Sequence, residues 1–239
     1  RDVAAMIDAI SDTKATILST TPLVLNELNQ DPESISSLRA IISGGDVLLP
    51  NHVDQLIGNY NLYNTYGPSE SCVCVTYHKI EGLNDVSYLG KPINNRSVFI
   101  LGEHENLLAA GVFGELCVSG KGLSLGYLNN ESLTNERFVP NPYKPGELMY
   151  KTGDLCRWHT DGTIEFMGRA DDQVKIRGFR IELGEIENAL LEKQNVDEAV
   201  VIVSEKNDNK YLVAYYLSDQ ALVADDLRDY LFQKLPDYM

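Results

Sequence analysis

Apolar and polar positions alternate in two different ways over residues 1–78. Short apolar runs typical of strands occupy residues 15–19, 38–43 and 60–63. Between them lie segments with apolar residues at helical spacing, residues 3–10, 22–28 and 50–57. Alternating strands and helices predict an α/β layer built on a parallel sheet. Ligands of such sheets bind at loops that follow the carboxyl ends of strands, here residues 44–46 and 64–70.

The pattern changes after residue 84. Short β segments separated by Gly, Pro and Asn are expected at residues 98–101, 115–118, 147–151 and 163–167, and residues 139–146 form a proline-rich loop. Residues 84–168 are therefore predicted to form a twisted antiparallel sheet or barrel. Residues 171–239 combine a strand near Val174, a helix from Leu183, strands at 198–203 and 211–217 joined by a turn at 206–210, and a final helix before Pro236. The predicted fold class is an α/β layer plus a β-rich subdomain plus a small α+β lobe.

Composition narrows the choice of partners. The chain has 239 residues, 44% of them hydrophobic, and a net charge of −15, so it can bury a sizeable core but would be repelled by nucleic acid. No apolar run approaches the ~20 residues that span a bilayer, and the N-terminus has no signal-peptide pattern. We expect a cytoplasmic protein with neither nucleic-acid nor membrane partners.

The cysteines favour neither a disulfide framework nor a zinc site. No Cys-x-x-Cys pair and no matching histidine spacing occur among Cys72, Cys74, Cys117 and Cys156, so reduced thiols are expected. If Cys72 and Cys74 lie on a strand they share one face, where small packing roles are expected.

Positive charge is concentrated between residues 169 and 180 of this acidic chain. The cluster consists of Arg169, Lys175, Arg177 and Arg180. It indicates an anionic partner, most simply a phosphate. The alternative is that the charges keep an exposed strand edge soluble, and charge alone favours that alternative.

The order of the sequence motifs favours the interpretation that this cluster binds a phosphate. The segment Gly168-Arg-Ala-Asp-Asp-Gln-Val-Lys-Ile-Arg-Gly-Phe-Arg-Ile-Glu-Leu-Gly-Glu-Ile-Glu187 closely resembles the hinge-and-loop motif of adenylate-forming enzymes, in the form found in adenylation domains of nonribosomal peptide synthetases. Four more stretches resemble that family, in its order: Asn64-Thr-Tyr-Gly-Pro-Ser-Glu70, Gly114-Glu-Leu-Cys-Val-Ser-Gly120 running on to Gly126-Tyr-Leu128, Tyr150-Lys-Thr-Gly-Asp-Leu155 and Leu235-Pro-Asp-Tyr-Met239. Five motifs in register make an accidental match implausible.

The resemblance implies a reaction and its cofactors. An amino-acid carboxylate would attack ATP to give aminoacyl-AMP, with Mg²⁺ as metal, and the aminoacyl group would pass to the phosphopantetheine thiol of a peptidyl carrier protein. Such enzymes serve antibiotic biosynthesis and other secondary metabolism, alongside neighbouring synthetase modules. The alternatives are an acyl- or aryl-acid:CoA ligase, a stand-alone carrier-protein ligase, and a non-catalytic scaffold that binds a carrier or another partner.

The resemblance also implies a domain plan. Residues 1–170 would be the C-terminal part of the large AMP-binding domain, and residues 171–239 the small C-terminal lobe, so the fold would be a partial adenylate-forming-enzyme fold. The phosphate loop would lie before Arg1 and the catalytic lysine after Met239. We therefore expect the chain to be a fragment that is inactive alone.

The motif from Asn64 to Glu70 supplies the first candidate site residues. Taken alone, an ordinary loop with a packed tyrosine explains it better than a ligand site. The resemblance instead implies that Tyr66 stacks on adenine, Ser69 touches phosphate and Glu70 holds Mg²⁺, with Asn64 and Gly67 in the same nucleotide-binding motif. Stacking on an aromatic side chain contributes roughly 1–3 kcal/mol per base.

The motif from Tyr150 to Leu155 is predicted to be a strand ending in a glycine turn, which leaves the Asp154 carboxylate free. Such a carboxylate can accept hydrogen bonds from both ribose hydroxyls, or it can satisfy its own turn. The resemblance implies the ribose role, with Arg169 near ribose and phosphate. Glu70, Asp154 and Arg169 are thus the catalytic candidates. The glycines between Gly120 and Gly126 lack the spacing of a nucleotide loop and are interpreted as structural.

The remaining candidates also come from the resemblance. Asp171 occupies the position of the hinge between the lobes. A hinge residue must absorb a large φ/ψ change. A loop containing Lys175, Arg177 and Gly178 would face the active site in the thioester-forming step. The substrate pocket would be lined by Ser19, Ile42, Gly44, Thr65, Val73 and Cys74. None of these is charged, which predicts a bulky apolar or aromatic amino acid.

Overall fold

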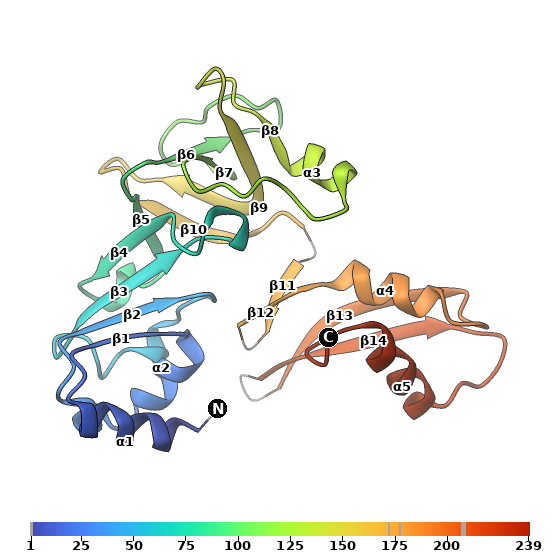
Figure 1. Ribbon diagram of the computed structural model, residues 1–239, viewed down its shortest axis with the longest axis horizontal. Coiled ribbons are helices and arrows are strands. Elements are labelled where there is room, and N and C mark those ends of the chain that lie inside the picture. The colour runs from blue at the N-terminus through green and yellow to red at the C-terminus, as the bar shows by residue number, and fades with distance from the viewer. Residues whose placement is uncertain (1, 172, 177, 207–208) are drawn as a thin grey trace. The chain divides into compact units, whose positions relative to one another are not determined.

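The computed structural model describes residues 2–171, 173–176, 178–206 and 209–239 (Figure 1). The chain divides into two compact units, residues 1–170 and 171–239. None of the helices in the described part of the chain has the length and apolar character that a bilayer crossing requires.

The first unit begins with three parallel strands, β1 (Ile17–Thr20), β2 (Ala40–Gly44) and β3 (Asn61–Tyr66). Helices α1 (Val3–Thr13) and α2 (Pro22–Leu28) accompany them, with short 3₁₀ helices at Pro32–Ile35 and Pro50–His52. Their apolar faces form one core that includes Leu25, Leu28, Ile41, Leu56 and Leu62. The predicted α/β layer is confirmed in this region.

The helix predicted at residues 50–57 is wrong, because only the 3₁₀ helix Pro50–His52 forms there. The Gln55 N–H donates to the Asn29 side-chain oxygen at 2.9 Å instead of to a carbonyl four residues back. The Val53 backbone oxygen accepts from the Leu56 N–H, three residues on, and from the Ile57 N–H, four residues on, so only an isolated helical bond forms here. The side chain of Asn29, directly after α2, thus takes the hydrogen bond that an α-helix needs at Gln55.

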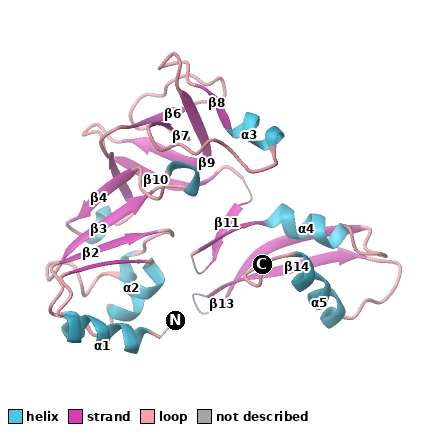
Figure 2. Cartoon of the chain, in the orientation of Figure 1, coloured by secondary structure: helices cyan, strands magenta, loops and turns pink. Residues whose placement is uncertain are grey.

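The same sheet continues with antiparallel strands. After β3 come β4 (Thr76–Ile80), β5 (Tyr88–Pro92), β10 (Ile164–Arg169), β9 (Leu148–Trp158), β7 (Gly114–Gly120) and β6 (Arg96–Leu101), and β8 (Phe138–Pro140) pairs with β9. Helix α3 (Glu131–Arg137) precedes β8, and 3₁₀ helices lie at Ser69–Ser71 and Leu83–Asp85. The β-rich subdomain is therefore confirmed, although it shares one sheet with the α/β layer (Figure 2).

The second unit is a small α+β lobe, as predicted. The antiparallel pair β11 (Gln173–Ile176) and β12 (Phe179–Glu182) leads into α4 (Leu183–Leu191). Strands β13 (Glu198–Lys206) and β14 (Asn209–Leu217) pair before α5 (Ala224–Lys234). The middle of the turn predicted at 206–210 lies outside the described residues.

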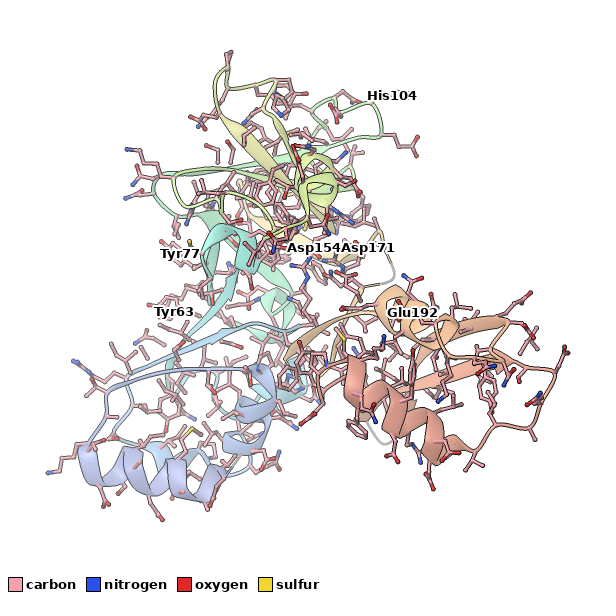
Figure 3. All side chains as sticks on the ribbon, turned by 45° about the vertical axis from the view of Figure 1, so that its right-hand side comes forward. Tyr63, Tyr77, His104, Asp154, Asp171 and Glu192 are labelled. Atoms are coloured by element: carbon pink, nitrogen blue, oxygen red, sulfur yellow. The ribbon has the colours of Figure 1, made fainter. Side chains whose placement is uncertain are left out.

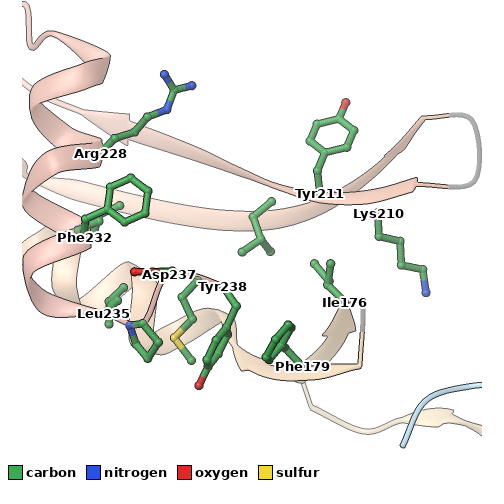
Figure 4. A pocket seen from close by; sticks show the side chains of 13 residues that line it. Ile176, Phe179, Lys210, Tyr211, Arg228, Phe232, Leu235, Asp237 and Tyr238 are labelled. Carbon is green, nitrogen blue, oxygen red and sulfur yellow. The ribbon is translucent and has the colours of Figure 1, made fainter. Parts of the chain in front are cut away.

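The core of this lobe and a cavity lie on its own elements. Ile181, Ile186 and Val201 are among the residues that form the core. A cavity of about 360 Å³ is lined by residues of β11, β12, β14, α5 and the C-terminal segment (Figure 4). At this cavity the rings of Phe179 and Tyr238 stack with centroids 4.4 Å apart. None of the predicted nucleotide-binding residues lines it.

Candidate active site

Asp154 lies inside a continuous strand, not after a turn (labelled in Figure 3). Gly153 has a left-handed φ of 74°, and its N–H donates to the Glu115 side chain at 2.9 Å. Strand β9 nevertheless continues through this point. It pairs with β7 before and after Gly153, with a register shift between the two stretches, and with β10 from Asp154 onward. Glycine allows such a kink in a strand. The predicted glycine turn is therefore wrong.

The Asp154 carboxylate is buried and bonded on both oxygens. Oδ1 accepts from Nη1 of Arg169 at 2.6 Å, and Oδ2 accepts a short hydrogen bond from the Tyr66 hydroxyl. The Asp154 and Arg169 side chains are only 7% and 12% exposed. The prediction that this carboxylate is free is wrong, because a buried charge needs partners. A carboxylate still has lone pairs for further donors such as ribose hydroxyls.

Tyr66 ends strand β3 rather than standing on a loop. It is 8% exposed and packs with Leu89 and Ile164. Burial, and then the nearby Asp154 charge, raise the pKa of Tyr66 well above its ordinary value. The phenol thus remains a hydrogen-bond donor to Asp154. Stacking of this ring on adenine stays a prediction that depends on the small exposed part of the ring.

Glu70 lies on the 3₁₀ helix Ser69–Ser71 and is 7% exposed, whereas the neighbouring Ser69 is exposed. Glu70 Oε1 accepts from the Tyr127 hydroxyl at 2.7 Å. A carboxylate oxygen is the kind of ligand that Mg²⁺ prefers. In the described part of the chain no group of three or more His, Cys, Asp or Glu gathers around a point. A metal held by Glu70 would therefore take its other ligands from nucleotide phosphates and water, as is usual for Mg²⁺.

The other two members of the motif have structural contacts. The Asn64 side-chain N–H₂ donates to the backbone oxygens of Val86 and Tyr88 at 3.2 and 3.0 Å. A Cβ on Gly67 would lie 2.5 Å from the backbone oxygen of Val73, so only glycine fits there. The sequence could not show these contacts, because each is made to a backbone group that only the fold brings close. A nucleotide role for Asn64 and Gly67 stays a prediction.

The predicted pocket residues fall into two groups. Ser19 pairs with Ile42 across β1 and β2, and Gly44 pairs with Thr65 across β2 and β3. These four are adjacent on three parallel strands, and each is at least partly exposed. The Thr65 hydroxyl donates to the Ser43 backbone oxygen at 2.8 Å.

Val73 and Cys74 lie on the loop that precedes β4. Val73 is 84% exposed and has a φ of 65°, after Cys72 with a φ of 57°. The expectation that Cys72 and Cys74 share a strand face is wrong, because two successive left-handed residues cannot belong to a strand. A role of all six residues in one substrate pocket stays a prediction.

The candidates of the second unit are described separately. Asp171 is half-buried, and its Oδ1 accepts from the Gln173 N–H at 3.4 Å. Lys175 lies on β11, and Gly178 lies in the turn before β12 with a φ of 80°. Arg177 lies outside the described residues. The hinge and thioester-step roles stay predictions.

Two tyrosines belong to the site but were given no role from the sequence. Tyr127 contacts Glu70, and the hydroxyls of Tyr127 and Tyr150 are 3.3 Å apart. Both residues stand in quoted motifs, Gly126-Tyr-Leu128 and Tyr150-Lys-Thr-Gly-Asp-Leu155. Their position in those motifs could have marked them as site residues. The spacing of residues in the sequence does not reveal which carboxylate a tyrosine hydroxyl contacts.

Comparison with known proteins agrees with the motifs. Residues 1–128 match the AMP-binding enzyme family, and residues 185–239 match the AMP-binding enzyme C-terminal domain. Tyrocidine synthase 1 of Brevibacillus parabrevis is 46% identical over 243 residues, which cover all of this chain and 22% of that protein. Surfactin synthase subunit 1 of Bacillus subtilis is 43% identical over 246 residues, which cover all of this chain and 7% of that protein. The chain thus spans about a fifth or less of these relatives.

Solved structures show the same architecture. PA1221, an NRPS protein containing adenylation and PCP domains, has a TM-score of 0.84 at 29% identity, over 99% of this chain and 49% of that one. NpsA-ThdA, an artificially fused adenylation–PCP di-domain NRPS from Klebsiella oxytoca, has a TM-score of 0.84 at 26% identity, over 100% and 46%. The fold is therefore part of the adenylate-forming-enzyme fold, as the motifs predicted.

Proposed function

Because the chain belongs to the AMP-binding enzyme family, we propose that it forms the part of an ATP-dependent ligase that activates an amino-acid carboxylate. In this reaction a carboxylate oxygen attacks the α-phosphorus of ATP, pyrophosphate leaves, and aminoacyl-AMP remains. The observation that carries the proposal is the convergence of Tyr66, Asp154 and Arg169 in one hydrogen-bonded cluster, although 88 residues separate Tyr66 from Asp154. Glu70 lies on the 3₁₀ helix that follows β3, four residues after Tyr66.

Each candidate then has a distinct task on the nucleotide. Asp154 accepts hydrogen bonds from the ribose hydroxyls, and Arg169 adds positive charge beside ribose and phosphate. Tyr66 contacts adenine, and Ser69 contacts a phosphate oxygen. Glu70 holds the Mg²⁺ of the nucleotide, which when bound neutralises charge on the phosphates. Fixed donors and charges at these positions favour the transition state because they need no reorganisation during the reaction.

The second half-reaction is proposed from the domains that the similar solved structures contain. PA1221 and NpsA-ThdA contain both adenylation and PCP domains. For this protein we assign the acceptor as a carrier-protein phosphopantetheine thiol, whose sulfur attacks the aminoacyl carbonyl while AMP leaves. Lys175 and Gly178 on the β11–β12 hairpin would contact that arm, and Asp171 would act as the hinge between the two half-reactions.

The substrate side chain is assigned as bulky and apolar or aromatic. The six pocket candidates carry no charge, and the Thr65 hydroxyl is already bonded to the Ser43 carbonyl. A charged substrate side chain would therefore lose hydration without gaining a charged partner there.

ATP–pyrophosphate exchange tests this function. The protein is expressed as its complete open reading frame and assayed with each amino acid, with an aryl acid plus coenzyme A as the competing substrate pair. We expect exchange with apolar or aromatic amino acids. Preferential exchange with Asp, Glu or Lys contradicts the substrate class. Absence of exchange with every amino acid, with product formed only from the aryl acid and coenzyme A, contradicts amino-acid activation.

A further inference from the structure

The loop after β7, residues 121–127, is attached to the turn that carries Glu70. The Ser124 N–H donates to the Glu70 backbone oxygen at 2.7 Å. The Arg96 guanidinium donates to the backbone oxygen of Ser71 at 2.9 Å and to that of Lys121. Two segments about 50 residues apart in sequence are therefore joined at the metal candidate, once by a main-chain hydrogen bond and once through the Arg96 side chain.

Tyr127 extends this attachment to the Glu70 side chain. Its hydroxyl has one hydrogen, which goes to Glu70 Oε1 at 2.7 Å. The Tyr150 hydroxyl lies 3.3 Å from the Tyr127 hydroxyl. The Tyr127 hydroxyl is therefore in hydrogen-bond contact with both Glu70 and Tyr150.

Tyr127 is itself fixed from two sides. The ring of Phe138 packs against both phenol rings, with centroids 5.7 Å from Tyr127 and 5.0 Å from Tyr150. The Tyr127 N–H donates to the Thr134 hydroxyl at 2.9 Å. Gly126 has a φ of 133°, and any Cβ there would overlap the Thr134 side chain. The backbone before Tyr127 thus requires glycine, and both the ring and the main chain of Tyr127 have defined partners.

We propose that Tyr127 is a positioning residue, which fixes the Glu70 carboxylate in the orientation that binds the Mg²⁺ of the nucleotide. The inference rests on the proposed function, because it takes Glu70 as the metal ligand. A carboxylate on a short 3₁₀ turn can rotate, whereas Mg²⁺ demands near-ideal octahedral geometry. Loss of a hydrogen-bond partner that orients a metal ligand typically weakens metal binding 10–100-fold.

Metal affinity is the direct readout. The complete-open-reading-frame protein is loaded with α,β-methylene-ATP and titrated with Mn²⁺ in place of Mg²⁺, and free Mn²⁺ is measured by electron paramagnetic resonance. We expect Tyr127→Phe to weaken Mn²⁺ binding by about tenfold or more, while metal-free AMP binding stays unchanged. Tyr143→Phe is the matched control, because it removes a phenol bonded at 2.6 Å to the Glu105 backbone oxygen in the same unit. This control should bind Mn²⁺ like the wild type.

A double substitution separates positioning from general damage to the fold. In a Glu70→Gln background, Tyr127→Phe should cause no further loss of Mn²⁺ affinity, because the group it positions has already changed. An equal loss in both backgrounds, or an unchanged affinity in the single variant, overturns the proposal. If the wild type forms adenylate but Tyr127→Phe binds Mn²⁺ normally, only the positioning role fails. If the wild type neither exchanges pyrophosphate nor binds Mn²⁺ with the nucleotide, the proposed function fails with it.

Discussion

Asp154 and Glu70 are both almost fully buried carboxylates of the first unit, yet they are held in different ways. Asp154 stands in the middle of β9, where it pairs with Arg169 of β10, and its carboxylate bonds to the Arg169 guanidinium and the Tyr66 phenol. Glu70 stands on a three-residue 3₁₀ helix, where the Tyr127 phenol reaches its side chain. Strand pairing already fixes the backbone of Asp154, whereas the short turn relies on contacts from a distant loop.

This difference matches the two proposed tasks. A ribose ligand needs only a fixed acceptor, and a buried Asp154 in a rigid sheet supplies one. A metal ligand needs a defined oxygen direction, which the phenol of Tyr127 provides for Glu70. We therefore expect the Asp154 contacts to dominate stability and the Glu70 contacts to dominate metal affinity.

Removing the cation beside Asp154 should have the largest effect on stability. Arg169→Met keeps most of the side-chain volume but leaves a buried carboxylate without its guanidinium, which costs about 3–5 kcal/mol of unfolding free energy. Urea unfolding measures the loss. Arg228→Met is the control, because the Arg228–Asp225 pair is 71% and 82% exposed and should be worth less than about 0.5 kcal/mol. Equal effects of both variants would show that burial does not set the strength of the Asp154 pair.

Removing the phenol beside Asp154 should cost less. Tyr66→Phe deletes one hydrogen bond to a charged acceptor, a loss of about 1.5–3 kcal/mol, while Arg169 still neutralises Asp154. The measurement is the same urea unfolding series, extended to the double variant Tyr66→Phe/Arg169→Met. Because both residues share one carboxylate, their effects should not add. Strict additivity would mean that the two contacts are independent, which would contradict a single cluster centred on the Asp154 carboxylate.

Sequence patterns located most strands and helices because their apolar periodicity reports which face is buried. They failed where a distant group decides local structure. Within residues 50–57 the Gln55 N–H bonds to the Asn29 side chain instead of to a helical carbonyl. At Gly153 the pairing of β9 with β7 resumes after a register shift, so the strand does not end in a turn. Tyr127 was quoted as part of a motif, yet its role requires knowing that Glu70, 57 residues earlier, lies against its hydroxyl.

Nucleotide titration calorimetry tests the division of labour between the two carboxylates most directly. AMP without metal and ATP with Mg²⁺ are titrated into the complete protein and into Asp154→Asn and Glu70→Gln. We predict that Asp154→Asn weakens binding of both ligands by a similar factor, because ribose is common to them. Glu70→Gln should weaken only the Mg²⁺-bound ATP. Equal weakening of metal-free AMP by Glu70→Gln, or unchanged AMP binding by Asp154→Asn, would contradict the account.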